Sequence, residues 1–252
     1  MAKVVAFTNQ KGGVAKTTTT LNLGVALQEL GHRVLVVDLD PQGNLTMSLG
    51  LNPDTARPSM YDVLVSGVNI QRAIYHQELD VAVANIDLAA VEIALSSLIG
   101  RERALSKALM QVDDQYDHIL VDTPPSLGLL TVNALTASDA VIVPVQCEYL
   151  SLRGLAQLER TLELVRENLN PKVHIAGIVP TMYDSRTIHG REAVEVLRSS
   201  FGDLVFETTI NKTIRFAEAP VRGESVLKYA PESRAAKAYR QLAREVLNGK
   251  KI

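Results

Sequence analysis

Residues 10–18 read Gln10-Lys11-Gly12-Gly13-Val14-Ala15-Lys16-Thr17-Thr18. The apolar run at residues 4–7 before them is typical of a buried strand, and residues 21–27 after them carry apolar side chains at helical spacing. A glycine loop between a strand and a helix points backbone N–H groups inward, and the helix adds the positive end of its dipole. The stretch therefore predicts a polyphosphate cradle, with Lys16 against the β- and γ-phosphates and the Thr17 hydroxyl on Mg²⁺.

The loop departs from the general pattern G-x-x-x-x-G-K-[ST], because Gln10 and Ala15 occupy the two outer glycine positions. A left-handed backbone at Ala15 costs about 1–2 kcal/mol because of its Cβ, so we expect a right-handed conformation there. The alternative interpretation is a plain glycine turn flanked by two solvated lysines. A second lysine, Lys11, directly before Gly12-Gly13 favours the phosphate cradle.

Residues 11–18 resemble the deviant Walker A motif of the ParA/MinD ATPases. The resemblance implies that ATP binds to this loop and that the early lysine, Lys11, reaches the phosphates of the partner subunit. It also implies catalytic roles for both Lys11 and Lys16. The implied nucleotide contacts in the loop are Lys11, Gly12, Gly13, Val14, Ala15, Lys16, Thr17 and Thr18.

A second buried strand, residues 33–38, ends in a pair of carboxylates, Asp38 and Asp40. Open α/β sheets bind ligands at the carboxyl ends of their parallel strands, beside such a phosphate loop. The segment resembles the family's switch I, D-x-D-P-Q-x-N, which implies that Asp40 orients the attacking water and that Asp38 lies near the magnesium shell. The alternative is that Asp40 only begins an Asx turn ahead of Pro41.

A third apolar strand ends in Asp122, within the sequence V-D-T-P-P-S. An apolar strand that ends in aspartate is the Walker B arrangement, which holds magnesium through its water shell. The sequence is similar to the family's switch II, so the resemblance places Asp122 in the magnesium site with Thr17 and Asp40 and gives it a catalytic role. The alternative is an aspartate that caps the next element.

Two later segments resemble functional segments of the family. Residues 180–186 resemble the segment near the adenine base, which implies that Met182 contacts the nucleotide. Residues 215–220 resemble the R-x-x-E-A-P segment of the chromosomal ParA/Soj branch, and Pro220 is a further candidate contact. Arg186 and Arg215 resemble positions that this branch uses for DNA contact; exposed arginines in surface ion pairs are the alternative.

Hydrophobic periodicity predicts most of the remaining elements. Strands are expected over residues 79–84, 116–122, 139–145 and 173–179, with a short edge strand at 208–210. Helices are expected over residues 101–112, 151–168, 188–200 and 233–247. No function is readable in residues 51–97, where Pro and Gly suggest short helices.

Composition limits the class of protein. The 252 residues predict one domain, 1–252, and include no apolar run near the roughly 20 residues that span a bilayer. With no room for a signal peptide before the first strand, we expect a cytoplasmic protein. The single cysteine, Cys147, cannot form an internal disulfide, and we expect it to be buried. A net charge of −2 does not indicate a nucleic-acid binder, so any DNA contact must come from a local patch.

The last helix, residues 233–247, is amphipathic. Its apolar side is rich in alanine and lacks the large side chains of a membrane-lying helix, so we expect it to dock on a sheet. Its basic face is either an ordinary solvated surface or part of a phosphate-binding patch. The basic face comprises Arg234, Lys237, Arg240 and Arg244, and the opposite side Ala235, Ala238, Leu242 and Val246.

Alternating strands and helices predict a doubly wound α/β fold, with a mostly parallel sheet covered by helices on both faces. The resemblance implies a P-loop ATPase of the ParA/Soj type that uses ATP and Mg²⁺ and associates with the nucleoid. In that family the ATP-bound homodimer binds double-stranded DNA without sequence preference, and a ParB-type centromere-binding partner stimulates hydrolysis. We expect no membrane partner, because a MinD-like ATPase would carry a membrane-targeting tail. A nucleotide-gated DNA-binding module with incidental hydrolysis is a further alternative, whereas a cluster-bearing reductase would need paired cysteines.

Overall fold

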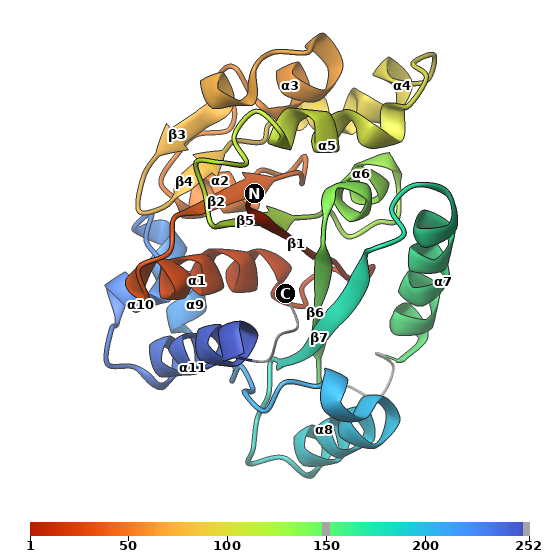
Figure 1. Cartoon of the computed structure of the whole chain (residues 1–252). Helices are drawn as coiled ribbons and strands as arrows, with labels where there is room; N and C mark the ends of the chain where they lie inside the picture. Colours follow the sequence, from red (N-terminus) through yellow and green to blue (C-terminus); the bar gives the residue numbers. More distant parts are fainter. Residues whose placement is uncertain (148–151, 249–252) are drawn as a thin grey trace.

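The fold is described from a computed structural model that covers residues 1–147 and 152–248 (Figure 1). The strands are β1 (Lys3–Phe7), β2 (Val34–Asp38), β3 (Ile74–His76), β4 (Asp80–Ala82), β5 (His118–Asp122), β6 (Ala140–Gln146) and β7 (His174–Thr181). The α-helices are α1 (Lys16–Glu29), α2 (Asn44–Ser48), α3 (Met60–Ser66), α4 (Val91–Ala94), α5 (Ala104–Leu109), α6 (Leu129–Ala137), α7 (Leu152–Asn168), α8 (Ile188–Phe201), α9 (Arg215–Val221), α10 (Val226–Tyr229) and α11 (Arg234–Asn248). Short 3₁₀ turns are η1 (Ile70–Ala73), η2 (Ile86–Ala90), η3 (Arg101–Arg103) and η5 (Gly202–Leu204).

The strands form one seven-stranded sheet in the order β3-β4-β2-β5-β1-β6-β7. Every pairing is parallel except β3 with β4, so the predicted doubly wound α/β fold is confirmed. β2 and β5 are buried along their whole length, which fits their continuous apolar sequences. β3 has no counterpart among the predicted strands; its three residues are partly or fully exposed and too short for a clear period.

Successive side chains of each strand enter two separate apolar cores, because alternate residues of a strand point to opposite faces. Val4 and Ala6 of β1 belong to the core under α3, α5, α6 and α7. Val5 and Phe7 belong to the core under α1, α10 and α11. Figure 1 shows these two groups of helices on opposite sides of the sheet. β1, which contributes side chains to both cores, leads directly into the phosphate loop.

The predicted edge strand at residues 208–210 is wrong. This segment follows β7 only through isolated contacts, in which the N–H groups of Phe206 and Ile210 donate to the carbonyls of Ile178 and Pro180. The carboxylate of Glu245 in α11 accepts the N–H groups of residues 207 and 208. Those donors are therefore taken by a side chain and do not continue a ladder.

The remaining element predictions are confirmed with shifted ends. The helix expected over 101–112 is split into η3 and a shorter α5. The helix expected over 151–168 is present as α7 from Leu152, and Ser151 lies outside the described residues. Cys147 is 8% exposed, as expected, and burial raises the pKa of its thiol to about 11.

The last helix, α11, docks as expected: its buried residues share one apolar core with α1 and with strand residues such as Phe7 and Ile142. Its buried side is centred one position further along the chain than expected, and it includes Tyr239, whose hydroxyl lies 3.3 Å from the hydroxyl of Thr19 in α1. Arg240 of the basic face is paired with Glu29 of α1 at 2.6 Å, so it belongs to the docking contact. The fully buried residues are Ala236, Tyr239, Leu242, Ala243 and Val246.

Candidate functional site

The carboxyl ends of β1, β2 and β5 meet at one edge of the sheet. Asp38 and Asp122 are the last residues of β2 and β5 and are direct partners in the parallel register. Phe7, the last residue of β1, is paired with the same Asp122. This register places the two acidic strand ends side by side, with Asp122 next to the end of β1, which leads into the phosphate loop.

The loop that joins β1 to α1 is held in an uncommon backbone conformation. Ala15 has φ 67° and ψ 33°, so the expected right-handed conformation is wrong. Two contacts fix the chain on either side: Thr181 donates its hydroxyl to the carbonyl of Val14, and the N–H of Thr19 donates to the carbonyl of Ala15. The second contact already belongs to α1, so Ala15 must make the turn itself. A left-handed alanine costs about 1–2 kcal/mol, and such strain is typical of functional loops.

The phosphate loop borders a cavity of about 380 Å³. Lys16, the first residue of α1, is only 7% exposed, and its Nζ donates to the carbonyl of Lys11 at 3.3 Å. Burial lowers the pKa of Lys16, while the nearby carboxylates of Asp122 and Asp40 raise it. The cavity is lined by Gly12, Gly13, Ala15, Lys16, Thr17, Thr18, Asp40, Gln42, Asn44, Ser48, Pro125 and Met182.

The residues beneath the loop fit a divalent cation. The Thr17 hydroxyl donates its hydrogen to Asp122 Oδ2 at 2.6 Å. The lone pairs of the Thr17 hydroxyl oxygen can therefore still bind a cation. Asp122 is fully buried, and its Oδ1 has no hydrogen-bond partner within the described residues. Burial raises the pKa of Asp122 well above its usual value, and the neighbouring Asp38 raises it further. An added positive charge would offset this cost of burying a carboxylate.

Magnesium would still need oxygen ligands from outside the protein. Within the described residues, no three His, Cys, Asp or Glu side chains gather in a way that could hold a metal ion. Mg²⁺ commonly takes one or two protein ligands and completes its octahedron with phosphate oxygens and waters. Thr17 and Asp122 therefore fit a site that is completed by a nucleotide.

Asp38 and Asp40 have different surroundings. Asp38 is buried and accepts hydrogen bonds from the N–H and hydroxyl of Thr46, at 2.9 and 2.8 Å. Burial raises the pKa of Asp38 to about 7, against the effect of these bonds. Asp40 accepts from the N–H of Gln42 at 3.0 Å, so the Asx turn that we considered as the alternative is formed. The same Asp40 also lines the cavity, so a turn role and a site role are compatible.

The other predicted nucleotide contacts are not all brought together. Met182 lines the cavity, as predicted for a nucleotide contact, and has a left-handed backbone with φ 51°. Pro220 lies in α9 and does not line this cavity. The side chain of Lys11 is exposed and also lies outside the lining. Residue-by-residue prediction did not name Gln42, Asn44 or Pro125, although they belong to the two switch-like motifs.

A second cavity, of about 590 Å³, gathers cationic side chains. Arg186 and Arg215, far apart in sequence, both line it, together with Lys212 and Arg234. Arg186 is 88% exposed and forms an ion pair with Asp184 at 2.8 Å, whereas Arg215 is exposed at the start of α9. The four cationic residues therefore line one cavity, which Asp184 also lines.

Comparisons with known proteins agree with this geometry. A family model described as an AAA domain matches residues 2–175. The sporulation initiation inhibitor protein Soj of Bacillus subtilis is 48% identical over 249 residues, which cover 98% of each chain. The chromosome partitioning protein ParA of Caulobacter vibrioides is 45% identical over 251 residues, with 98% of this chain and 94% of the relative covered.

Solved structures of related chains superpose closely. A structure of cobyrinic acid a,c-diamide synthase from Mycobacterium smegmatis, with bound ADP and magnesium, has a TM-score of 0.88 at 43% identity, covering 100% of this chain and 96% of that one. The cell division ATPase MinD of Pyrococcus furiosus has a TM-score of 0.80 at 28% identity, covering 98% and 99%. The chain therefore belongs to the ParA/MinD family of P-loop ATPases and, within it, to the ParA/Soj type. The predicted cofactors, ATP and Mg²⁺, agree with a second Mycobacterium smegmatis structure, which holds an ATP analogue and magnesium.

Proposed function

We propose that this chain is an ATP-dependent partitioning ATPase that folds as one domain, 1–252. ATP and Mg²⁺ bind in the cavity beneath the phosphate loop, with Thr17 and Asp122 on the metal side and Lys16 on the phosphates. Asp40 orients the attacking water. The observation that carries the proposal is the Thr17–Asp122 hydrogen bond beneath the loop, beside a buried carboxylate oxygen without a partner in the described residues. This arrangement is suited to a nucleotide-bound cation.

Dimer formation is proposed to depend on Lys11. Its side chain is exposed outside the cavity of its own subunit, which is compatible with a reach towards a second copy. Lys11→Ala should therefore bind ATP as a monomer with unchanged affinity but fail to dimerise. Size-exclusion chromatography with ATP measures this, and Lys107→Ala in α5 is a matched control with the same charge change. A dimer peak that persists in Lys11→Ala would remove the cross-subunit role.

DNA binding is proposed to use the cationic cavity lined by Arg186, Lys212, Arg215 and Arg234. Two copies in an ATP-bound dimer would double this positive charge and attract the DNA backbone without reading its sequence. Arg186 must give up its ion pair with Asp184 to contact phosphate, whereas no such pair holds the exposed Arg215 within the described residues. We therefore rank Arg215 above Arg186 as a contact.

Arg215→Ala should weaken ATP-dependent DNA binding on any sequence, and Arg186→Ala should weaken it less. Removing one phosphate contact should reduce the slope of log K against log salt by about 0.9, because fewer counterions are released. Fluorescence anisotropy on two unrelated duplexes over a salt series measures both quantities. Arg33→Ala, which removes an exposed arginine paired with Asp117, is the control. Unchanged affinity and slope in the Arg186/Arg215 double variant would place the DNA surface elsewhere, with Arg234 the next residue to test.

The deciding experiment for the function compares DNA binding with ATP, with ADP and without nucleotide. DNA binding that requires ATP, together with hydrolysis stimulated by a ParB-type partner, is the expected result. Lipid vesicles are the parallel arm, because a MinD-like protein would bind them under ATP; no helix within the described residues is long and apolar enough to span a bilayer. ATP-dependent vesicle binding without DNA binding would contradict the proposal. Single-turnover hydrolysis that is equal with and without partner would favour the nucleotide-gated module.

The Mycobacterium smegmatis neighbour is named as a diamide synthase, and one observation bears on whether this chain has that activity. A synthase that takes its nitrogen from glutamine would need an activated thiol or a comparable nucleophile. The single cysteine, Cys147, is buried with a pKa of about 11 and is therefore a poor nucleophile. Partitioning is the function that the site supports better.

A further inference from the structure

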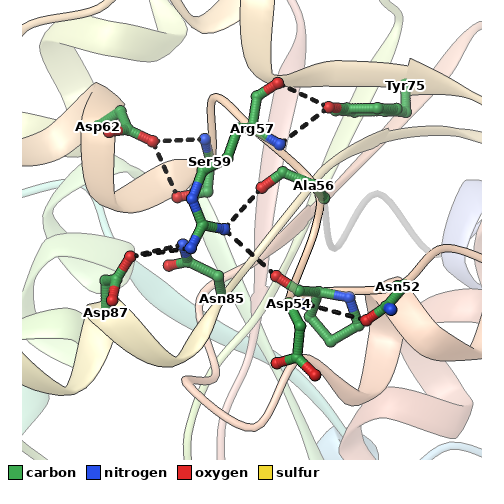
Figure 2. A network of polar contacts seen from close by, with 10 residues as sticks. Asn52, Asp54, Ala56, Arg57, Ser59, Asp62, Tyr75, Asn85 and Asp87 are labelled. Atoms are coloured by element: carbon green, nitrogen blue, oxygen red, sulfur yellow. Dashed lines mark hydrogen bonds and ion pairs between the residues drawn. The ribbon is translucent and has the colours of Figure 1, made fainter.

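A polar network outside the nucleotide cavity holds the loop at residues 52–57 (Figure 2). The guanidinium of Arg57 is its centre. Nη1 donates to the carbonyls of Ala56 and Pro53, at 2.8 and 3.3 Å. Nη2 donates to the carboxylate of Asp87 at 3.2 Å. A single side chain thus closes the loop on itself and ties it to the segment that follows β4.

The far side of the network is anchored to the sheet. Asp87 also accepts from the side-chain amide of Asn85 at 2.9 Å, and Asn85 is fully buried. The hydroxyl of Tyr75 in β3 donates to the carbonyl of Arg57 and accepts from its N–H, at 2.9 and 3.1 Å. Figure 2 shows the guanidinium between Asp87 on one side and the loop carbonyls on the other. Arg57 therefore has a fixed position relative to β3 and β4.

The loop at residues 52–57 packs against the turn at residues 40–43, which carries Asp40. A Cβ built on Gly43 would lie 2.8 Å from Cβ of Pro53, so the proline ring rests on the backbone of Gly43. Gly43 has φ 62° and donates its N–H to the carbonyl of Asp40 at 2.9 Å. Gln42 donates to the carboxylate of Asp40. A displacement of Pro53 would therefore also displace the turn at residues 40–43, which orients the Asp40 carboxylate.

The other end of the same segment has its own support. The hydroxyl of Thr46 accepts from the N–H of Ala84 at 3.0 Å and donates to Asp38. Residues 38–46 are therefore held at Thr46 by Ala84, two residues beyond β4, and at Gly43 by Pro53. Only the second support depends on a side chain that is half exposed, since the Arg57 side chain is 45% exposed.

We propose that Arg57 is a positioning residue for ATP hydrolysis, which acts through Pro53 and Gly43 on the orientation of Asp40. The inference rests on the proposed function, because it assumes that Asp40 orients the attacking water. Small displacements of a positioned group slow a reaction steeply, while the phosphate cradle itself is untouched. The network thus affects the chemical step and not nucleotide binding.

Arg57→Ala should lower the single-turnover rate of hydrolysis about tenfold at unchanged ATP affinity. Arg57→Lys should recover part of the rate, because an ammonium can reach Asp87 but lacks the fork that serves both carbonyls. Arg72→Ala, an exposed arginine of η1, is the matched control and should keep the full rate. If Arg57→Ala has a lower melting temperature but an unchanged hydrolysis rate, Arg57 only stabilises the fold and the inference is overturned. A rise in KM at unchanged kcat, or an equal loss in Arg72→Ala, would overturn it as well.

A double-mutant cycle tests the path itself. Asp87→Asn should slow hydrolysis less than Arg57→Ala, because Arg57 keeps its bonds to the two loop carbonyls. The Arg57→Ala/Asp87→Asn variant should be no slower than Arg57→Ala, because Asp87 acts through Arg57. Rate losses that multiply would contradict this path. Asp40→Ala is assayed in parallel to separate the two hypotheses. If Asp40→Ala is slow and the Arg57 variants are fast, the proposed function stands and the inference fails; if the parent protein does not hydrolyse ATP, the proposed function fails.

Discussion

Lys16→Gln should abolish measurable ATP binding. Lys16 is buried at the start of α1 beneath the phosphate loop, where burial lowers its pKa and the nearby carboxylates of Asp122 and Asp40 favour its charged form. Glutamine keeps most of the length but removes the cation that faces the phosphates, in a site where electrostatic stabilisation is strong because water is largely displaced. Removing the charge also leaves two neighbouring carboxylates without compensation, which further opposes binding of an anion. Isothermal titration with ATP and Mg²⁺ measures the loss.

The control for this prediction is Lys107→Gln, which removes an exposed lysine of α5 and should leave ATP affinity unchanged. A thermal melt of Lys16→Gln without nucleotide shows whether the variant is folded. If the folded variant binds ATP with the affinity of the parent protein, Lys16 does not face the phosphates and the assignment of the loop fails.

Asp40→Ala should retain ATP and dimerise, yet hydrolyse ATP roughly a hundredfold or more slowly. The carboxylate lines the cavity but is not part of the loop that cradles the phosphates, so its loss raises the barrier without emptying the site. A long-lived ATP-bound dimer is the expected consequence. Hydrolysis with the ParB-type partner present, followed together with size-exclusion chromatography, measures both effects.

Asp40→Asn separates the two roles of this side chain. The Asp40 carboxylate accepts the N–H of Gln42 at 3.0 Å, and this bond forms the turn. The side-chain oxygen of asparagine can accept the same bond, but asparagine carries no charge. A catalytic carboxylate predicts that Asp40→Asn is about as slow as Asp40→Ala. If asparagine restores the parent rate, Asp40 is only a turn residue and the attacking water is oriented by another group. Asp114→Ala, which removes an exposed carboxylate elsewhere, controls for the change in net charge.

Much of the candidate site was predictable because its residues lie in short, contiguous motifs. Lys16 and Thr17 follow the glycines of one loop, and Asp122 ends a strand of unmistakable apolar character. A strand end and its parallel neighbour must share one edge of the sheet, so the approach of Asp122 to the loop followed from the fold class alone. The position of Pro220 away from the cavity was not predictable in this way, because a motif gives no distance to a site formed by other segments.

The sequence by itself determined most of the strands and helices along the chain, the phosphate loop and the two acidic strand ends, since these depend on periodicity and on neighbouring residues. Tertiary structure decided the left-handed conformation of Ala15, which lies between a bond from Thr181 to Val14 and the first hydrogen bond of α1. It also decided that Arg240 pairs with Glu29 and that Arg57 supports the turn of Asp40 through Pro53. Each of these contacts joins residues from different segments of the chain, and the sequence pattern around either residue does not predict the other. Their energies depend on distance and burial in the folded chain, which spacing along the sequence does not contain.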